Sequence, residues 1–338
     1  MNLKEERYSK FALVREMMET TGVIKQFDPS RPKRFAEKVP AAGGLFLTGE
    51  GSSRIFPAKR MIYDVMRRGL DLRASTDGST QALEYLLDDY LVFGASNSGQ
   101  TKEVIRLFNS LKNAGHQALY GLTANRDTML EKISLDTHIL GCGKEEAVAA
   151  TKSVFEQALF YDALIHYVAG EEMNGLNELS VQVEEAMTLN IDDEISDIIS
   201  RAGIIYFAGR NTGVAEELTL KTNEITRKKS EFLEGTYAVH GIEEVMDAGE
   251  VVIWISPFKD EAEKFEECLI KGVGVNIIAI SDQETAFPTI IIPDAGKYRE
   301  YVELAAGWNI LVETGIKLGI DLDKPRRARK VGNIYTGS

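Results

Sequence analysis

Residues 91–101 read Leu-Val-Phe-Gly-Ala-Ser-Asn-Ser-Gly-Gln-Thr, and an amphipathic stretch from Glu103 to Leu111 follows them. The apolar run, the Ser/Gly turn and the helix-periodic stretch form one strand–turn–helix unit. A second unit of this kind starts with the apolar run 251–255 and has its turn at residues 256–260. Because parallel strands need helical crossovers between them, this alternation predicts an α/β fold with parallel sheets.

Four apolar runs in the first half of the chain recur in the second half, in the same order and at nearly the same spacing. The pairs are 45–48 with 204–208, 91–95 with 251–255, 118–123 with 276–281, and 138–141 with 290–293. Each block closes with a long segment of helical periodicity, residues 152–168 in the first and 301–318 in the second. The repeat predicts two doubly wound, flavodoxin-like parallel-sheet modules in tandem.

This pattern divides the chain into four expected regions. They are an N-terminal helical segment (1–39), a first module that binds phosphate (40–175), a second module that carries catalytic residues (200–320), and a C-terminal tail or lid (321–338). In open α/β sheets, ligands bind beyond the carboxyl ends of the strands. The strand-to-helix loops are therefore where functional side chains are expected.

The composition narrows the classes of protein to which the chain can belong. A formal net charge of -13 disfavours binding to nucleic acid or to an anionic membrane. The two cysteines, Cys142 and Cys268, lie far apart and have no metal-ligand spacing around them. The N-terminus lacks the apolar core of a secretion signal, and no apolar run approaches the roughly 20 residues of a membrane helix. We expect a soluble, cytoplasmic enzyme.

The turn after residues 91–95 has the composition of an anion site. Ser96, Ser98 and Thr101 offer hydroxyl groups, Gly99 allows close approach of the backbone, and a helix N-terminus follows. Helix capping alone would also favour these residue types. The corresponding turn of the second block has a single hydroxyl, from Ser256. We therefore expect the phosphate site in the first module.

The glycines after the first strand do not make a dinucleotide fingerprint. Gly49 and Gly51 are present, but the G-x-G-x-x-G/A pattern needs a small residue at position 54, where Arg54 stands. A small phosphoester is thus a better ligand than a dinucleotide, and acid–base chemistry on such a ligand requires no metal and no organic cofactor.

Several motifs resemble those of the sugar isomerase (SIS) family. Residues 96–101 resemble its phosphosugar-binding loop, Ser-x-Ser-Gly-Glu/Asn-Thr, and residues 145–152 resemble its Glu-x-x-Val-Ala-Ser/Ala-Thr-Lys segment. The second block resembles the isomerase domain of the glucosamine-6-phosphate synthases in the spacing of Gly209-Arg210, Glu217, Lys221, Glu224 and His240-Gly241, and the tail resembles the Asp-x-Pro-Arg-x-x-x-Lys terminus of these enzymes at Asp323–Lys330. Two positions depart from the family pattern and bear on the choice of substrate. Ala150 replaces a serine, and Ile242 stands where many relatives have proline.

The resemblance implies a set of phosphate-binding residues in the first module. These are Ser53, Ser96, Ser98, Gln100 and Thr101. It also implies that the ligand is a small sugar phosphate.

A carboxylate pair with a lysine between them forms the candidate catalytic group. At their spacing, Glu217, Lys221 and Glu224 share one face of a helix, which is also the pattern of a solvated salt-bridge ladder. The resemblance assigns Glu224 the proton transfer between C1 and C2, and Lys221 the support of the developing oxyanion. Because this helix follows the Gly209-Arg210 turn, we expect Glu224 at the carboxyl edge of the second sheet.

Two further residues receive roles only through the resemblance. His240 would open the sugar ring and reach the active site of a neighbouring subunit, which implies a homodimer, whereas alone it could simply cap a loop. Lys330 would lie near the carbonyl carbon, where an amine can form a Schiff base, whereas alone it reads as part of a solvated terminus.

Together these features predict a phosphosugar isomerase-type enzyme that acts on an amino-sugar 6-phosphate or a ketosamine 6-phosphate, as an isomerising deaminase or deglycase. The glutaminase domain of the glucosamine-6-phosphate synthases uses an N-terminal cysteine as its nucleophile, whereas no cysteine precedes Cys142 here. We therefore expect the enzyme to be independent of glutamine. Two alternatives stay open. The chain could be a simple aldose–ketose phosphosugar isomerase, or a sugar-phosphate sensor without catalytic activity.

Overall fold

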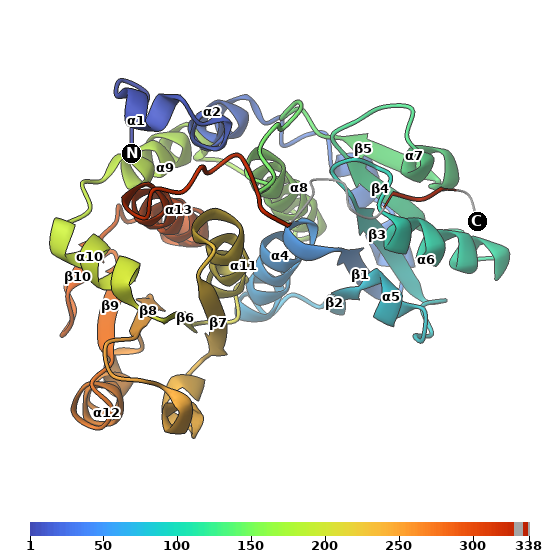
Figure 1. Ribbon diagram of the computed structural model, residues 1–338. Helices are drawn as coiled ribbons and strands as arrows, with labels where there is room; N and C mark the ends of the chain where they lie inside the picture. The colour runs from blue at the N-terminus through green and yellow to red at the C-terminus, as the bar shows by residue number, and fades with distance from the viewer. Residues whose placement is uncertain (328–333, 337–338) are drawn as a thin grey trace. The chain divides into compact units, whose positions relative to one another are not determined.

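The computed structural model describes residues 1–327 and 334–336, so Lys330 lies outside the described residues. The chain divides into two compact units (Figure 1). The first module consists of Gly22–Glu146, Ala150–Leu176 and Arg329–Ser338, and the second module consists of Met1–Thr21, Ala147–Ala149 and Asn177–Ala328.

The first module contains a five-stranded parallel sheet of order β2-β1-β3-β4-β5. The strands are β1 (Gly44–Gly49), β2 (Ala74–Gly78), β3 (Tyr90–Ala95), β4 (Leu119–Thr123) and β5 (Asp136–Ile139). The last of these begins two residues earlier than predicted, and β2 was not predicted at all. This edge strand is only half-buried and reads Ala-Ser-Thr-Asp-Gly, so it has no apolar run to reveal it.

Helices cover both faces of this sheet. Phe35 on one face packs its ring against Phe93 and Phe160 at centroid distances of 5.6 and 5.5 Å. Phe46 and Val92 belong to the apolar cluster on the other face. The helices of this module are α3 (Lys33–Ala36), α4 (Ile55–Arg67), α5 (Ser79–Ala82), α6 (Lys102–Asn113), α7 (Met129–Ile133) and α8 (Lys152–Val168). The predicted helix 152–168 is thereby confirmed.

The second module repeats this architecture with the sheet order β10-β9-β8-β6-β7. Its strands are β6 (Ile204–Gly209), β7 (Lys229–Glu234), β8 (Val251–Ile255), β9 (Asn276–Ser281) and β10 (Thr289–Ile291). The edge strand β7 was not predicted, because only one of its residues is fully buried. Tandem doubly wound modules with parallel sheets are therefore confirmed.

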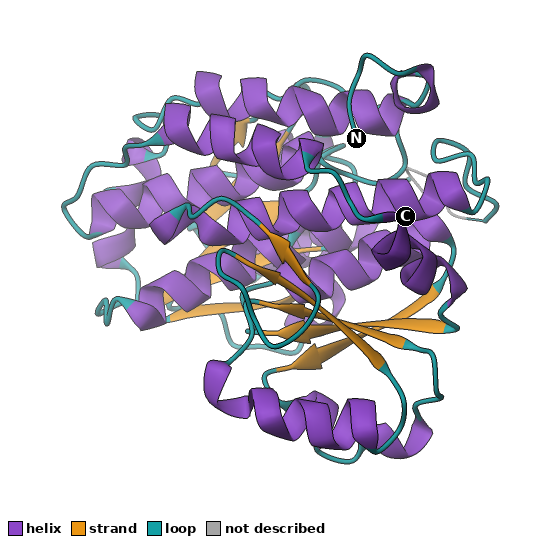
Figure 2. Cartoon of the chain, turned by 90° about the vertical axis from the view of Figure 1, so that its left-hand side faces the viewer, coloured by secondary structure: helices purple, strands orange, loops and turns teal. Residues whose placement is uncertain are grey.

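Figure 2 shows the second sheet with helices on both sides. The helices of this module are α1 (Glu6–Ser9), α2 (Ala12–Gln26, whose last turns belong to the first module), α9 (Leu176–Thr188), α10 (Asp193–Arg201), α11 (Val214–Thr226), α12 (Ala262–Phe265), which continues as a π-helix at Glu266–Lys271, and α13 (Arg299–Lys317). The rings of Trp254 and Phe265 stack at 3.6 Å in the core, and Trp308 is fully buried. Gly319 follows α13 with φ of +65°, as a helix stop should.

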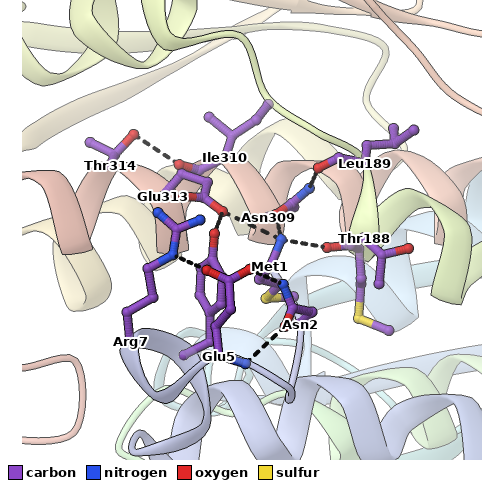
Figure 3. A network of polar contacts seen from close by, with 12 residues as sticks. Met1, Asn2, Glu5, Arg7, Thr188, Leu189, Asn309, Ile310, Glu313 and Thr314 are labelled. Carbon is purple, nitrogen blue, oxygen red and sulfur yellow. Dashed lines mark hydrogen bonds and ion pairs between the residues drawn. The ribbon is translucent and has the colours of Figure 1, made fainter.

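The N-terminal residues pack on α9 and α13 (Figure 3). The ammonium group of Met1 donates to Asn309 Oδ1 at 2.7 Å and lies 3.4 Å from Glu313 Oε1. Tyr8 Oη donates to the same carboxylate oxygen at 2.6 Å. Burial, then the hydrogen bond to Glu313, raises the pKa of Tyr8, so this network keeps the phenol neutral.

Candidate functional site

Three hydroxyl groups converge where β3 leads into α6. Ser96 Oγ lies 2.7 Å from Thr101 Oγ1 and 3.5 Å from Ser98 Oγ. Ser98 Oγ also accepts from the amide of Gln100 at 3.2 Å. The N-terminus of the helix α6 follows directly, and its first turn carries backbone N–H groups and the positive end of the helix dipole. This hydroxyl loop, residues 96–101, therefore presents hydroxyl and N–H donors of the kind that bind anions.

Gly99 is required by the shape of this loop. Its φ is +64°, a backbone conformation that glycine adopts readily. A Cβ atom there would lie 2.5 Å from the side chain of Thr128. Any other residue would push the hydroxyl loop away from α7.

Glu145 ties the hydroxyl loop to the start of α8. Its carboxylate accepts from the Thr151 amide at 2.7 Å, from Ser153 Oγ at 2.7 Å and from Asn97 Nδ2 at 2.5 Å. The residue is 2 % exposed. The sequence placed Glu145 in the motif of residues 145–152 but predicted no role for it. A carboxylate that organises a loop through long-range contacts does not recur at any regular spacing in the sequence.

The remaining phosphate candidates lie on and beside this loop. Ser53 ends a short 3-10 helix after β1, and β1 runs alongside β3 with Gly49 opposite Ala95. The loops that follow these two strands therefore leave the same edge of the sheet. The carbonyl of Gln100 accepts from the amide of Tyr335 at 3.0 Å. Four of the five candidates thus lie in one loop, and the fifth lies in the loop after the neighbouring strand.

On α11 the three charged residues form a buried cluster. Lys221 Nζ lies 2.8 Å from Glu224 Oε2 and 3.2 Å from Glu217 Oε1. The side chains of Lys221 and Glu217 are fully buried, and that of Glu224 is 22 % exposed. Burial alone would lower the pKa of Lys221, but the two carboxylates outweigh burial and raise it. A solvated salt-bridge ladder is excluded, and Glu224 alone keeps access to solvent.

The expected position of Glu224 at the carboxyl edge of the second sheet is wrong. The helix α11 returns the chain from the end of β6 to the start of β7, and these strands are parallel. Glu224 lies in its last turn. Ser230, at the start of β7, donates to Thr219 O at 2.7 Å and contacts Asn223 Oδ1 at 3.0 Å. The carboxylate of Glu224 therefore lies near the amino edge of this sheet.

His240 lies at the opposite edge. It follows the end of β7 and stands between the 3-10 helices Tyr237–Val239 and Ile242–Val245. The residue is exposed, and its imidazole makes no hydrogen bond within residues 1–327 and 334–336. Within the second module, the structure does not bring His240 and Glu224 together. In the same described ranges, no group of His, Cys, Asp and Glu side chains is arranged to hold a metal.

Known structures share this architecture. The tagatose-6-phosphate ketose/aldose isomerase of Escherichia coli aligns with 95 % of this chain and 97 % of its own, at a TM-score of 0.79 and 17 % identity. The glucosamine-6-phosphate deaminase of Thermotoga maritima aligns with 96 % of this chain and 99 % of its own, at a TM-score of 0.73 and 19 % identity.

Sequence comparison points the same way. The chain is 24 % identical over 329 residues to the glutamine–fructose-6-phosphate aminotransferase (isomerizing) of Aeropyrum pernix, a match that covers 89 % of this chain and 53 % of the relative. The chain is therefore similar over most of its length to sugar-phosphate enzymes of this kind, and it has the fold of two doubly wound modules in tandem that the solved structures share.

No family model matches the sequence, and this chain spans about half the length of the curated relatives it matches. Within the described residues, no helix is both long and apolar enough to cross a membrane.

The second module holds a different group at the position that corresponds to the hydroxyl loop. Ser256 has φ of +44°, and its hydroxyl donates to the buried carboxylate of Glu303. Arg299 Nε lies 3.2 Å from this carboxylate, and Arg210 donates to the carbonyl of Ser256. The single hydroxyl of this turn is thus already engaged by a carboxylate, which supports placing the anion site in the first module alone. Glu303 was not predicted as a site residue, because it lies one turn into α13, whose apolar periodicity indicates a core helix.

Glu303 is expected to make the second module more stable at acid pH. Burial, and then the neighbouring charge of Glu300, raise the pKa of Glu303 from 4.5 to about 7. Because the folded state then binds more protons than the unfolded state, stability falls as pH rises from 4.5 to 7. Between these values the wild type should lose about 1–3 kcal/mol relative to Glu303→Gln. Chemical denaturation at a series of pH values measures this, and parallel curves for the two proteins would contradict it.

Proposed function

We propose that this chain is a phosphosugar isomerase-type enzyme that acts on an amino-sugar 6-phosphate or a ketosamine 6-phosphate and releases its nitrogen without glutamine. The observation that supports this most is the buried Lys221 between Glu217 and Glu224. Burying the charged side chains of Lys221 and Glu217 on one helix is costly, and a protein that only binds a sugar phosphate has no need of it. The partly exposed Glu224 is the member of this cluster that a substrate can reach.

In this proposal the hydroxyl loop of the first module holds the phosphate. Glu224 removes a proton from one of the two carbons C1 and C2 and returns it to the other, through an enaminol, so that the carbon bearing nitrogen becomes an imine. Water then adds to this imine, the C–N bond breaks, and the nitrogen leaves as ammonia or as the free amine while a carbonyl oxygen takes its place. The ammonium of Lys221, which contacts Glu224 at 2.8 Å, offers positive charge near the developing oxyanion. His240 opens the sugar ring in the active site of a second subunit, so the active form is a homodimer. Lys330 supplies the amine of a Schiff base.

A panel assay in deuterated buffer tests the proposal. Phosphorylated amino sugars, ketosamines and simple ketoses are incubated with the protein, with and without glutamine, and ammonia, amino acid and sugar products are measured. We expect turnover of a nitrogen-containing substrate, with deuterium entering at C1 or C2. Turnover of simple ketoses alone would favour the aldose–ketose isomerase, and binding without turnover would favour the sensor.

The double variant Ser98→Ala/Thr101→Val is expected to raise KM about tenfold or more and to leave kcat nearly unchanged. Each hydroxyl would donate to the charged phosphate in both the ground state and the transition state, so its loss removes uniform binding. Ser110→Ala, an exposed serine of α6, serves as the control. An unchanged KM in the double variant would show that the phosphate does not bind at this loop.

A further inference from the structure

The tail leaves α13 through a short segment that is fixed on several sides. This segment, Asp321–Lys324, is termed the tail root. Leu322 is 5 % exposed and packs against α13, because a Cβ atom on Gly315 would lie 2.6 Å from Leu322 Cδ2. The tail root therefore has a defined position in the second module.

Asp323 joins the tail root to α2. Its two carboxylate oxygens accept from the amides of Ala12 and Leu13, at 2.7 and 2.9 Å. These amides belong to the first turn of the helix, whose N–H groups have no partner inside the helix. The carboxylate thus acts as a cap supplied from about 310 residues further along the chain.

Arg227 joins the tail root to α11. Its Nη2 donates to the carbonyl oxygens of Asp321 and Lys324, at 2.9 and 2.7 Å. Its Nη1 donates to the carbonyl of Ile225 at 2.9 Å. One guanidinium therefore bridges the last turn of the helix that carries Glu224 and the two ends of the tail root. Lysine has no second nitrogen with which to make this bridge.

The backbone of Arg227 supports a role for its side chain. The residue is the C-cap of α11 and has φ of +56°, a left-handed conformation in which glycine is usual and other residues are strained. Strained residues persist where their surroundings hold them, and they gather at sites of function. Here the conformation directs the guanidinium back over the last turn and onto the tail root.

We propose that Arg227 is a positioning residue that fixes the tail root to the last turn of α11, so that the tail root and Glu224 hold a set position relative to each other. The kinetic part of this inference rests on the proposed function. The anchoring part does not, because it concerns contacts within the second module only.

Arg227→Gly is the variant that tests the proposal. Glycine fits the left-handed backbone, so the variant should keep the fold of α11 while it lacks the guanidinium. Hydrogen–deuterium exchange is followed in peptides that cover residues 12–13 and residues 321–324. We expect exchange in both peptides to rise about tenfold or more, because two hydrogen bonds of the tail root are lost and the cap on α2 loosens with it. Arg227→Lys should give an intermediate rise.

The kinetic readout uses the substrate that the panel assay identifies. We expect kcat of Arg227→Gly to fall about tenfold or more, with KM nearly unchanged, because misplacing a catalytic group costs rate rather than phosphate binding. Arg201→Gly, an exposed arginine of the same module whose side chain is 76 % exposed, is the matched control.

The outcomes separate the two proposals. Faster exchange together with a loss of kcat supports the positioning role. Unchanged exchange at residues 12–13 and 321–324 overturns the anchor, and faster exchange with full kcat overturns its part in the reaction. Faster exchange in a protein that turns over no substrate of the panel supports the anchor and assigns the failure to the proposed function.

Discussion

Glu224→Gln is expected to lower kcat by about 10²- to 10⁴-fold while the affinity for the sugar phosphate stays nearly unchanged. A general base contributes this much to a proton transfer, and the amide cannot accept the proton. The proposed phosphate contacts lie in the first module, so this substitution leaves them intact. Because Gln keeps the size of Glu and can still accept from Lys221 Nζ, the buried cluster on α11 should persist.

Two measurements check this expectation. Incorporation of solvent deuterium at C1 or C2 should fall in parallel with kcat, and titration with the sugar phosphate should give the wild-type dissociation constant. Glu184→Gln, an exposed carboxylate on α9, should behave as the wild type. Full activity in Glu224→Gln, or turnover by the wild type with neither deuterium exchange nor net isomerisation, would show that this carboxylate is not the base.

Asp162→Ala is expected to lower the free energy of unfolding of the first module by about 3–5 kcal/mol. Asp162 on α8 forms an ion pair with Arg60 on α4, and the two side chains are 2 and 4 % exposed. Removing the carboxylate leaves a guanidinium buried with its main counter-charge gone. Denaturant unfolding followed by far-UV circular dichroism measures the loss.

A second ion pair of the same module is the control. Arg34 and Asp136 lie 2.7 Å apart, but their side chains are 50 and 42 % exposed. Asp136→Ala should therefore cost less than about 1 kcal/mol. The double variant Arg60→Met/Asp162→Leu should regain most of the lost stability, since apolar residues can fill the same space. Equal losses from Asp162→Ala and Asp136→Ala would contradict the argument from burial.

The interior strands could be predicted from sequence because they are apolar throughout, as in residues 91–95 and 251–255. The edge strands β2 and β7 could not, because they carry mainly polar residues, whereas short apolar runs located the other two edge strands, β5 and β10. The helices α8 and α13 could be predicted because apolar residues recur in them at helical spacing. The same apolar residues bury these helices in the fold.

The candidate site, like the fold, could be predicted from the sequence only in part. The density of hydroxyls in residues 96–101 predicted a loop that the structure folds as one cluster. Helical spacing placed Lys221 and Glu224 on one face correctly. Spacing alone does not show which end of α11 lies at the carboxyl edge of the second sheet, and the expected edge for Glu224 was wrong. Long-range contacts such as those of Glu145 and Arg227 leave no periodic signal, so only the fold reveals them.

Both tryptophans of the chain, Trp254 and Trp308, lie in the core of the second module, and the first module contains none. Intrinsic emission excited at the indole band therefore reports on one module alone, while circular dichroism reports on both. For Asp162→Ala, a shift of the dichroic transition without a shift of the emission transition would mean that the two modules unfold as separate cooperative units. Coincident shifts would mean that they unfold as one.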